Sequence, residues 1–304
     1  MAKLTKAQAK AHMRALEILR QDRLNEADRE FVFDNWQEGA NHINGQAGAF
    51  FTPMGLAWDL SIDVAGLKIL DLCAGIGVLG YAAYHRGRYD RENQRQVTCV
   101  EINPAYVEVG RKLLPEARWV CADAFSDLSE LGRFDWVVSN PPFGAIDGRG
   151  DFDLAIVERA GDFADDATFI LPAGSVPFAY SGRRGHDDTR PSPKAARFRD
   201  RTRINLRAGC GVDCSFYRDE WRNAAPAVEI ALADYAEARA AMAETVTLHD
   251  GPELQHLVPG VAPVALQVRQ LAQETQRRAA RRGAAPLPLG GLFDETARLQ
   301  QDLF

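Results

Sequence analysis

Apolar and polar positions follow a helical period up to about residue 60 and a strand-like pattern from residue 68 onwards. Thr5 to Gln8 forms a capping box ahead of one amphipathic helix, and a second helix is predicted over residues 26–36. Thr52-Pro53 begins a third helix that runs through Leu60. The chain is therefore expected to open with helices rather than with a sheet.

From residue 68 onwards, short apolar runs alternate with helical stretches, which is typical of a parallel sheet covered by helices on both faces. We predict a doubly wound α/β fold with a mostly parallel, seven-stranded sheet. A closing antiparallel pair is expected from residues 214–217 and 227–234. The other strands are predicted at residues 68–72, 96–101, 118–121, 134–139 and 168–171.

Changes in composition divide the chain into three parts. Residues 1–47 form a helical N-terminal extension, residues 48–240 the α/β core, and residues 241–304 a C-terminal helix and tail. Within the core, residues 181–207 carry nine Arg and Lys against three Asp, together with two Gly and two Pro. That composition predicts a long basic loop.

Bulk composition limits the classes of function. The net charge of −6 excludes a polycation, so a contact with nucleic acid must come from local basic patches. The five cysteines include no CxxC pair, and Cys73, Cys99 and Cys121 lie in or beside apolar runs, so we expect buried thiols and no metal site. The polar N-terminus and the absence of a long apolar run predict a cytoplasmic protein without a membrane partner.

The most informative motif is Asn140-Pro141-Pro142-Phe143, which follows the apolar run ending at Ser139. The asparagine offers an amide oxygen, and the prolines fix the backbone and remove two N–H donors. Phe143 adds a flat apolar face. This combination suits a planar substrate that carries an NH2 group.

Three acidic residues end the three preceding strands. Asp71 begins Asp71-Leu72-Cys73-Ala74-Gly75-Ile76-Gly77, whose glycines allow a ligand to approach the backbone, although such a turn also occurs in many doubly wound folds. Glu101 could hold a ribose diol or be a solvated strand end, and Asp123 could read an adenine amino group or cap a helix. The carboxyl ends of parallel strands meet in one crevice, so the ordered set favours one ligand site.

This ordered set resembles the class I S-adenosylmethionine-dependent methyltransferases. By that resemblance, Asp71 and Gly75 line the methionine part of the cofactor, Glu101 holds its ribose and Asp123 reads its adenine; the product would be S-adenosylhomocysteine and no metal is needed. The cofactor site implied in this way comprises Phe51, Thr52, Pro53, Asp71, Ala74, Gly75, Gly77, Glu101, Ile102, Asp123, Ala124 and Asn140.

Phe51-Thr52-Pro53 also resembles the aromatic-Thr-Pro element of N6-adenine DNA methyltransferases, and residues 211–222 are similar to that family's late strand pair. The resemblance implies methyl transfer to a flipped-out adenine in a bacterial or phage DNA, with Asn140, Pro141, Pro142 and Phe143 as the catalytic residues. Methylation of RNA, methylation of a protein glutamine and a catalytically silent DNA-binding protein stay open as alternatives. A nucleoid-associated location follows from the DNA substrate.

Further expectations concern partners. Because no separate recognition domain is evident, we expect a homodimer on double-stranded DNA. Residues 264–282 are predicted as a helix whose arginines contact phosphates or are simply solvated. Gln300, Leu303 and Phe304 resemble a peptide that docks on a bacterial sliding clamp. The phosphate contacts expected from the basic loop are Arg183, Arg184, Arg190, Lys194, Arg197, Arg199, Arg201 and Arg203.

Overall fold

The computed structural model describes residues 5–37, 50–87, 94–143, 151–184, 192–221, 227–240 and 242. The chain divides into two units, residues 1–241 and 242–304, and the first contains the whole fold described below. The predicted C-terminal helix at residues 264–282 and the terminal residues Gln300, Leu303 and Phe304 lie outside the described residues, as does Arg190.

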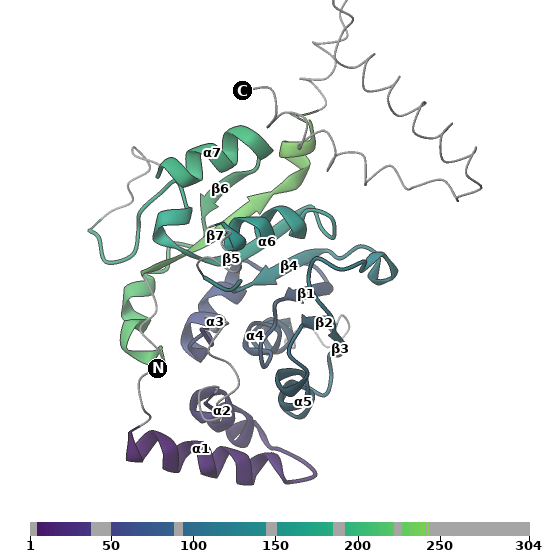
Figure 1. The fold of residues 1–304 in the computed structure, drawn as a ribbon, viewed down its shortest axis with the longest axis vertical. Helices are drawn as coiled ribbons and strands as arrows, with labels where there is room; N and C mark the ends of the chain where they lie inside the picture. The colour runs from purple at the N-terminus through teal and green to yellow at the C-terminus, as the bar shows by residue number, and fades with distance from the viewer. Residues whose placement is uncertain are drawn as a thin grey trace, which may run out of the picture. The chain divides into compact units, whose positions relative to one another are not determined.

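The centre of the molecule is a seven-stranded sheet with the order β3-β2-β1-β4-β5-β7-β6 (Figure 1). Strands β1 to β5 pair in parallel, while β7 runs antiparallel to both of its neighbours, β5 and β6. This confirms the predicted doubly wound, mostly parallel sheet. The strands are β1 Lys68–Leu72, β2 Gln96–Glu101, β3 Arg118–Cys121, β4 Trp136–Ser139, β5 Asp166–Pro172, β6 Asn205–Ala208 and β7 Val228–Asp234.

Helices cover both faces of this sheet. On one face, α3, α4 and α5 share a buried core with β1 and β2 residues such as Ile69 and Val97, and α1 and α2 pack outside them; on the other, α6 and α7 share a second core with Leu70 and Phe169 (Figure 1). The helices are α1 Lys6–Leu19, α2 Glu26–Asn35, α3 Met54–Leu60, α4 Val78–Arg86, α5 Pro104–Leu113, α6 Phe152–Ala160 and α7 Pro193–Thr202. Short 3-10 helices are Ser61–Asp63, Ser129–Leu131, Ala173–Ser175 and Cys214–Glu220.

Local sequence explains where several helices begin. Thr5 and Gln8 form the expected reciprocal capping box of α1, and Asn103 caps α5, whose first residue is Pro104. Asn25 and Asp28 form a second capping box at the start of α2. These caps fix the helical N-terminal extension and the helix that follows β2.

Two predictions near the end of the core are wrong, at least in part: the long basic loop and the closing antiparallel pair. The segment 181–207 is not one long loop, because it contains α7 and β6. Of the antiparallel pair, residues 228–234 do form the expected strand, β7, but residues 214–217, and with them the strand pair implied over residues 211–222, do not form a strand. Residues Cys214–Glu220 make a 3-10 helix instead, and β7 pairs with β5 and β6. The antiparallel edge of the sheet is therefore completed by β6, which lies at the end of the basic segment.

The cysteine prediction holds in part. All five thiols are free, and Cys99 is buried, but Cys73 is half-buried and Cys121 is exposed. Cys121 is the last residue of β3, a strand at the edge of the sheet, where one side has no neighbouring strand to cover it.

In the described part of the chain, no helix is long and apolar enough to cross a bilayer.

Candidate functional site

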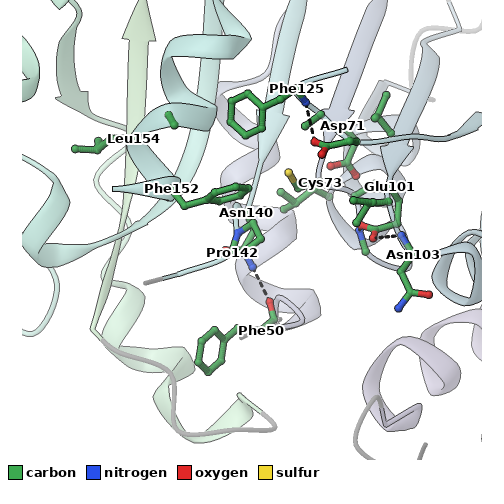
Figure 2. A pocket seen from close by; sticks show the side chains of 18 of the residues that line it. Phe50, Asp71, Cys73, Glu101, Asn103, Phe125, Asn140, Pro142, Phe152 and Leu154 are labelled. Carbon is green, nitrogen blue, oxygen red and sulfur yellow. Dashed lines mark hydrogen bonds between the residues drawn. The ribbon is translucent and has the colours of Figure 1, made fainter. Parts of the chain in front are cut away.

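One cavity of about 1240 Å³ lies at the carboxyl ends of the central strands. Asp71, Glu101, Asp123 and Asn140 all line it, which is the arrangement expected from their positions at four successive strand ends. Figure 2 shows Glu101 and Asp71 at one side, Phe152 and Leu154 at the other, and Asn140 and Cys73 between them. Four residues far apart in sequence thus face one space.

Most of the predicted cofactor residues belong to this cavity. Pro53 and Gly77 lie behind the lining, as the residues that begin α3 and α4. Pro141 and Phe143 of the predicted catalytic motif are likewise not part of the wall. The predicted residues that line the cavity are Phe51, Thr52, Asp71, Ala74, Gly75, Glu101, Ile102, Asp123, Ala124, Asn140 and Pro142.

The side chain of Asn140 is held in one orientation. Its Nδ2 donates to the carbonyl oxygen of Phe50 at 2.7 Å and to Thr52 Oγ1 at 2.9 Å (Figure 2). The Phe50 carbonyl can only accept, so the NH2 end faces it and the Thr52 hydroxyl, and the amide oxygen faces away. That oxygen, Oδ1, is buried and has no hydrogen-bond partner among the described residues. A buried acceptor without a donor is costly, so the site is prepared for an incoming N–H.

Aromatic rings surround this amide on its outer side. Phe50 and Phe143 stack with ring centroids 5.3 Å apart, and the ring of Trp221 lies 6.4 Å from each of them. We refer to Phe50, Phe143 and Trp221 as the aromatic cluster. Phe143 is only partly buried against the core, so the cluster places an apolar surface next to Asn140.

Asp71 is a buried carboxylate, 1% exposed, at the floor of the cavity. Its Oδ2 accepts a hydrogen bond from the Gly80 amide at 2.7 Å, while Oδ1 has no partner among the described residues. Burial, and to a smaller extent the nearby charge of Glu101, raises the pKa of Asp71 to about 7. A cationic ligand group near Oδ1 would favour the ionised form.

Glu101 ends β2 and is tied to the backbone on both sides. Its Oε2 accepts from the Gly75 amide and its Oε1 from the Asn103 amide, each at 2.8 Å (Figure 2). Burial raises the pKa of Glu101, and the amide hydrogen bonds oppose that shift. Each carboxylate oxygen keeps a second lone pair, which is what a pair of neighbouring hydroxyl groups requires.

Asp123 adopts a local turn rather than a helix cap, because its Oδ1 accepts from the Phe125 amide at 2.9 Å and no helix starts there. The turn brings Phe125 to the cavity wall, where its ring meets that of Phe152 edge-on at 5.5 Å. The end of the cavity beyond Asp123 is therefore aromatic.

The turn between β1 and α4 is in an unusual backbone conformation. Gly75 and Gly77 have φ angles of 57° and 93°, and Cys73 has a φ of 63° although it has a side chain. Such non-glycine residues are uncommon and concentrate at functional sites. The Cys73 thiol lines the cavity, and burial together with the charges of Glu101, Asp71 and Asp123 raises its pKa well above the usual value, so it is held as a neutral thiol.

The N-terminal extension supports this site from behind. Trp36, at the end of α2, packs edge-on against Phe51 and Tyr106 with centroid distances of 5.8 Å. Both of those rings line the cavity. The extension thereby fixes the segment that carries Thr52.

The basic residues of segment 181–207 are split between two environments. Lys194, Arg197 and Arg201 line the cavity from α7. Lys194 Nζ lies 2.7 Å from the buried carboxylate of Asp153, and Arg201 forms a bidentate pair with Glu158 at 3.0 and 2.8 Å. Arg183 and Arg184 are exposed at the start of the segment.

Sequence reasoning missed the Phe50 carbonyl, the backbone of Cys73 and the ring of Trp221. The only signal for Trp221 was the concentration of aromatic residues over residues 216–221. Among the described residues, no group of three or more His, Cys, Asp or Glu side chains is arranged to hold a metal ion.

Residues 56–164 match the protein-family model described as "Methyltransferase small domain". The matched segment runs from α3 to the end of α6, so it contains Asp71, Glu101, Asp123 and Asn140. The match supports the coarse expectation of an S-adenosylmethionine-dependent methyltransferase and leaves the methyl acceptor open. Among curated proteins, no relative matches the chain.

Solved structures give three examples of similar chains. A proposed RNA methyltransferase from Pyrococcus horikoshii is 22% identical over 60% of this chain and 85% of its own, with a TM-score of 0.41. The methyltransferase subunit of a type I restriction-modification system from Streptococcus thermophilus is 16% identical over 71% of this chain and 51% of its own, with a TM-score of 0.45. A proposed class I methyltransferase from Listeria monocytogenes is 10% identical over 76% and 81%, with a TM-score of 0.47. None of these likenesses indicates a substrate.

Proposed function

We propose that the protein transfers a methyl group from S-adenosylmethionine to the N6 amino group of an adenine in DNA. The observation that carries the proposal is the Oδ1 atom of Asn140, a buried acceptor that finds no donor among the described residues and points away from its two anchors. An exocyclic NH2 group of a base supplies the missing hydrogen. The aromatic cluster beside it accommodates a planar ring.

The remaining residues of the cavity fit the methyl donor. The unpartnered Oδ1 of Asp71 suits its ammonium group, the open lone pairs of Glu101 suit its ribose hydroxyls, and Asp123 with Phe125 suits its adenine. When bound, S-adenosylmethionine supplies an electrophilic methyl group on a sulfonium. No covalent intermediate with the protein is required.

Asn140 and Pro141 act on the acceptor nitrogen. The lone pair of an adenine amino nitrogen is delocalised into the ring, which makes that nitrogen a poor nucleophile. When Asn140 Oδ1 and the Pro141 carbonyl accept its two hydrogens, the nitrogen is drawn towards tetrahedral geometry and its lone pair is freed for attack. Because the Asn140 amide is held in advance by Phe50 and Thr52, its part in this step is electrostatic preorganisation together with alignment.

The proposal of DNA as the substrate rests on the aromatic-Thr-Pro element and on the basic segment. Thr52 contacts the catalytic amide directly, and Arg183 and Arg184 are exposed where a duplex could reach them. A base inside a duplex cannot reach Asn140, so the target adenine must be flipped out. A homodimer on double-stranded DNA and docking of the C-terminal peptide on a sliding clamp stay predictions.

The test is incubation of the purified protein with labelled S-adenosylmethionine and, separately, unmethylated duplex DNA, total RNA and ribosomal protein. We expect label in DNA, recovered as N6-methyladenine after digestion to nucleosides. Asn140→Ala should lower the rate by about 100-fold or more, because it removes one preorganised acceptor, while cofactor binding measured by calorimetry changes much less. Asn35→Ala, on α2, is the matched control. Label in RNA or in a glutamine side chain would contradict the proposal.

A further inference from the structure

Phe216 is the most exposed of the large apolar side chains described, with 81% of its surface accessible. Single exposed apolar residues are ordinary on protein surfaces and need no explanation by themselves. Three features distinguish this one: the contacts that hold the turn that carries it, the hydrogen bonds between that turn and the start of the basic segment, and its connection to the aromatic cluster.

The turn is fixed by its inward-facing residues. Phe216 belongs to the 3-10 helix Cys214–Glu220, in which Cys214 is buried and the Tyr217 hydroxyl donates to Asp59 of α3. The Tyr217 ring covers Gly55, where an added Cβ would come within 2.5 Å of it. The turn is thus pinned to α3 while the Phe216 side chain is left in solvent. A flexible segment could fold an exposed ring inward, whereas the contacts of this turn with α3 keep the Phe216 ring in solvent.

A second set of contacts joins the turn to the start of the basic segment. Asp213 Oδ1 accepts from the Ser215 amide at 2.9 Å and from the Gly182 amide at 2.8 Å. The Cys214 amide in turn donates to Ser181 Oγ, which is itself bound to the buried carboxylate of Glu229. Arg183 and Arg184, both exposed, follow Gly182 directly, and the turn itself carries the exposed Arg218 together with the exposed acidic residues Asp219 and Glu220.

The same turn leads to the catalytic motif. It ends at Trp221, whose ring lies 6.4 Å from that of Phe143. Five residues at the 3-10 rise of roughly 2 Å each place Phe216 about 10 Å along the chain from Trp221. An exposed aromatic ring on a turn that is hydrogen-bonded to the arginine-bearing segment and leads to the aromatic cluster is suited to act as a wedge that enters a duplex.

We propose that Phe216 enters the DNA stack at the position that the target adenine vacates and holds the extruded state open. The inference rests on the proposed DNA substrate and deepens it by assigning the residue that replaces the flipped base. Phe216 acts as a positioning residue, because it does not contact the reacting atoms. Arg183, Arg184 and Arg218 would hold the flanking phosphates.

The test separates base extrusion from chemistry. Sequencing of DNA methylated by the wild-type protein supplies the modified sequence, which is placed in two short duplexes. In one, the target adenine is paired with thymine; in the other, it lies opposite an abasic position and has no pair to break. Single-turnover methylation is measured on both with the wild type, Phe216→Ala, Phe216→Trp and the control Met13→Ala, which alters an exposed apolar residue of α1.

We expect Phe216→Ala to slow methylation of the paired duplex by about 10-fold or more, since stacking of an aromatic side chain on a base is lost. On the abasic duplex the loss should stay below about 3-fold, because extrusion there is less costly. Phe216→Trp should restore the rate, and Met13→Ala should leave both duplexes unaffected.

An equal loss on the two duplexes, or no loss on the paired one, overturns the inference while the proposed function stands. A wild-type protein that methylates no DNA overturns the proposed function, and this inference with it. Thermal unfolding of Phe216→Ala should match the wild type, because the replaced side chain is in solvent.

Discussion

The side-chain NH2 group of Asn140 donates to Thr52 Oγ1 at 2.9 Å, across 88 positions of sequence. This contact joins the segment Phe51-Thr52-Pro53 to the proline motif. Thr52 is 5% exposed, so its hydroxyl is not exchanged for water. The orientation of the amide therefore depends on a residue outside the catalytic motif.

Replacing Thr52 by valine tests this dependence. Thr52→Val keeps the shape but removes the acceptor, leaving the Phe50 carbonyl as the only anchor of the amide among the contacts described. We expect kcat to fall about 5- to 10-fold, the value of one hydrogen bond of about 1 kcal/mol, with little change in cofactor affinity. Thr52→Ser retains the hydroxyl and should restore kcat. A fall in cofactor affinity with unchanged kcat would contradict the assignment.

The raised pKa of Asp71 predicts how ligand binding depends on pH. Its folded-state pKa of about 7 lies above the ordinary value of 3.8, so the folded protein holds a proton that the unfolded chain releases between these values. The stabilising contribution of this group is therefore complete below about pH 4 and is lost as the pH rises through about 7. A ligand ammonium prefers the ionised carboxylate, so the affinity for the cofactor should increase as the pH rises through about 7.

The measurement is calorimetric titration with S-adenosylhomocysteine between pH 6 and pH 8. Asp71→Asn keeps an oxygen for the Gly80 amide, removes the charge, and should flatten the pH dependence. Glu101→Gln is the matched variant, because the pKa of Glu101 is also raised by burial and its charge contributes to that of Asp71. A pH dependence that survives in Asp71→Asn and disappears in Glu101→Gln would assign the titration to Glu101.

Gly110, inside α5, is expected to resist replacement although alanine is the better helix former. An added Cβ would lie 2.1 Å from the Trp119 ring, and that ring is held by its Nε1 donating to the Leu114 carbonyl at 3.1 Å. Gly110→Ala should therefore lower the free energy of unfolding by about 1–3 kcal/mol. Denaturant unfolding measures this change. A double variant with Trp119→Leu, which removes the ring, should be less affected by the alanine; equal sensitivity would contradict the steric explanation.

Two arginines of the basic segment give a matched test of the DNA surface. Arg184 is exposed, whereas Arg201 is committed to the carboxylate of Glu158. Arg184→Gln should weaken duplex binding and lower the slope of log affinity against log salt by about 1, as expected for one lost phosphate contact. Arg201→Gln should change the slope much less. Titration of a fluorescent duplex at several salt concentrations checks both, and equal slopes for the two variants would contradict the distinction.

The sheet could be predicted from sequence because each parallel strand is buried on both faces and reads as an apolar run. Residues of β1 and β4 show this clearly, since Ile69, Leu70, Val137 and Val138 are all completely buried. The strand ends then placed Asp71, Glu101, Asp123 and Asn140 at one edge. The order and direction of the strands are thus enough to bring these four residues to one cavity.

The basic segment could not be predicted in the same way, because its charges hid two regular elements. Helix α7 buries only Ala195, Phe198 and Thr202, and five of its remaining positions are Lys, Arg or Asp. Ser192-Pro193 does signal a helix start, since Ser192 caps the helix and proline takes its first position. Two features of the site had no signal in the sequence. Phe50 contributes its backbone carbonyl, and Cys73 contributes a left-handed φ angle, and neither depends on the side chain.

Because its NH2 end is tied down on two sides, Asn140 cannot turn over to present a donor. A base that carries an oxygen at the corresponding position, such as thymine or the hypoxanthine left by adenine deamination, would bring two oxygens face to face. If the proposed function holds, the same tether that readies the amide for an amino group also makes it reject a carbonyl, so discrimination among bases is built into the pocket before any sequence is read.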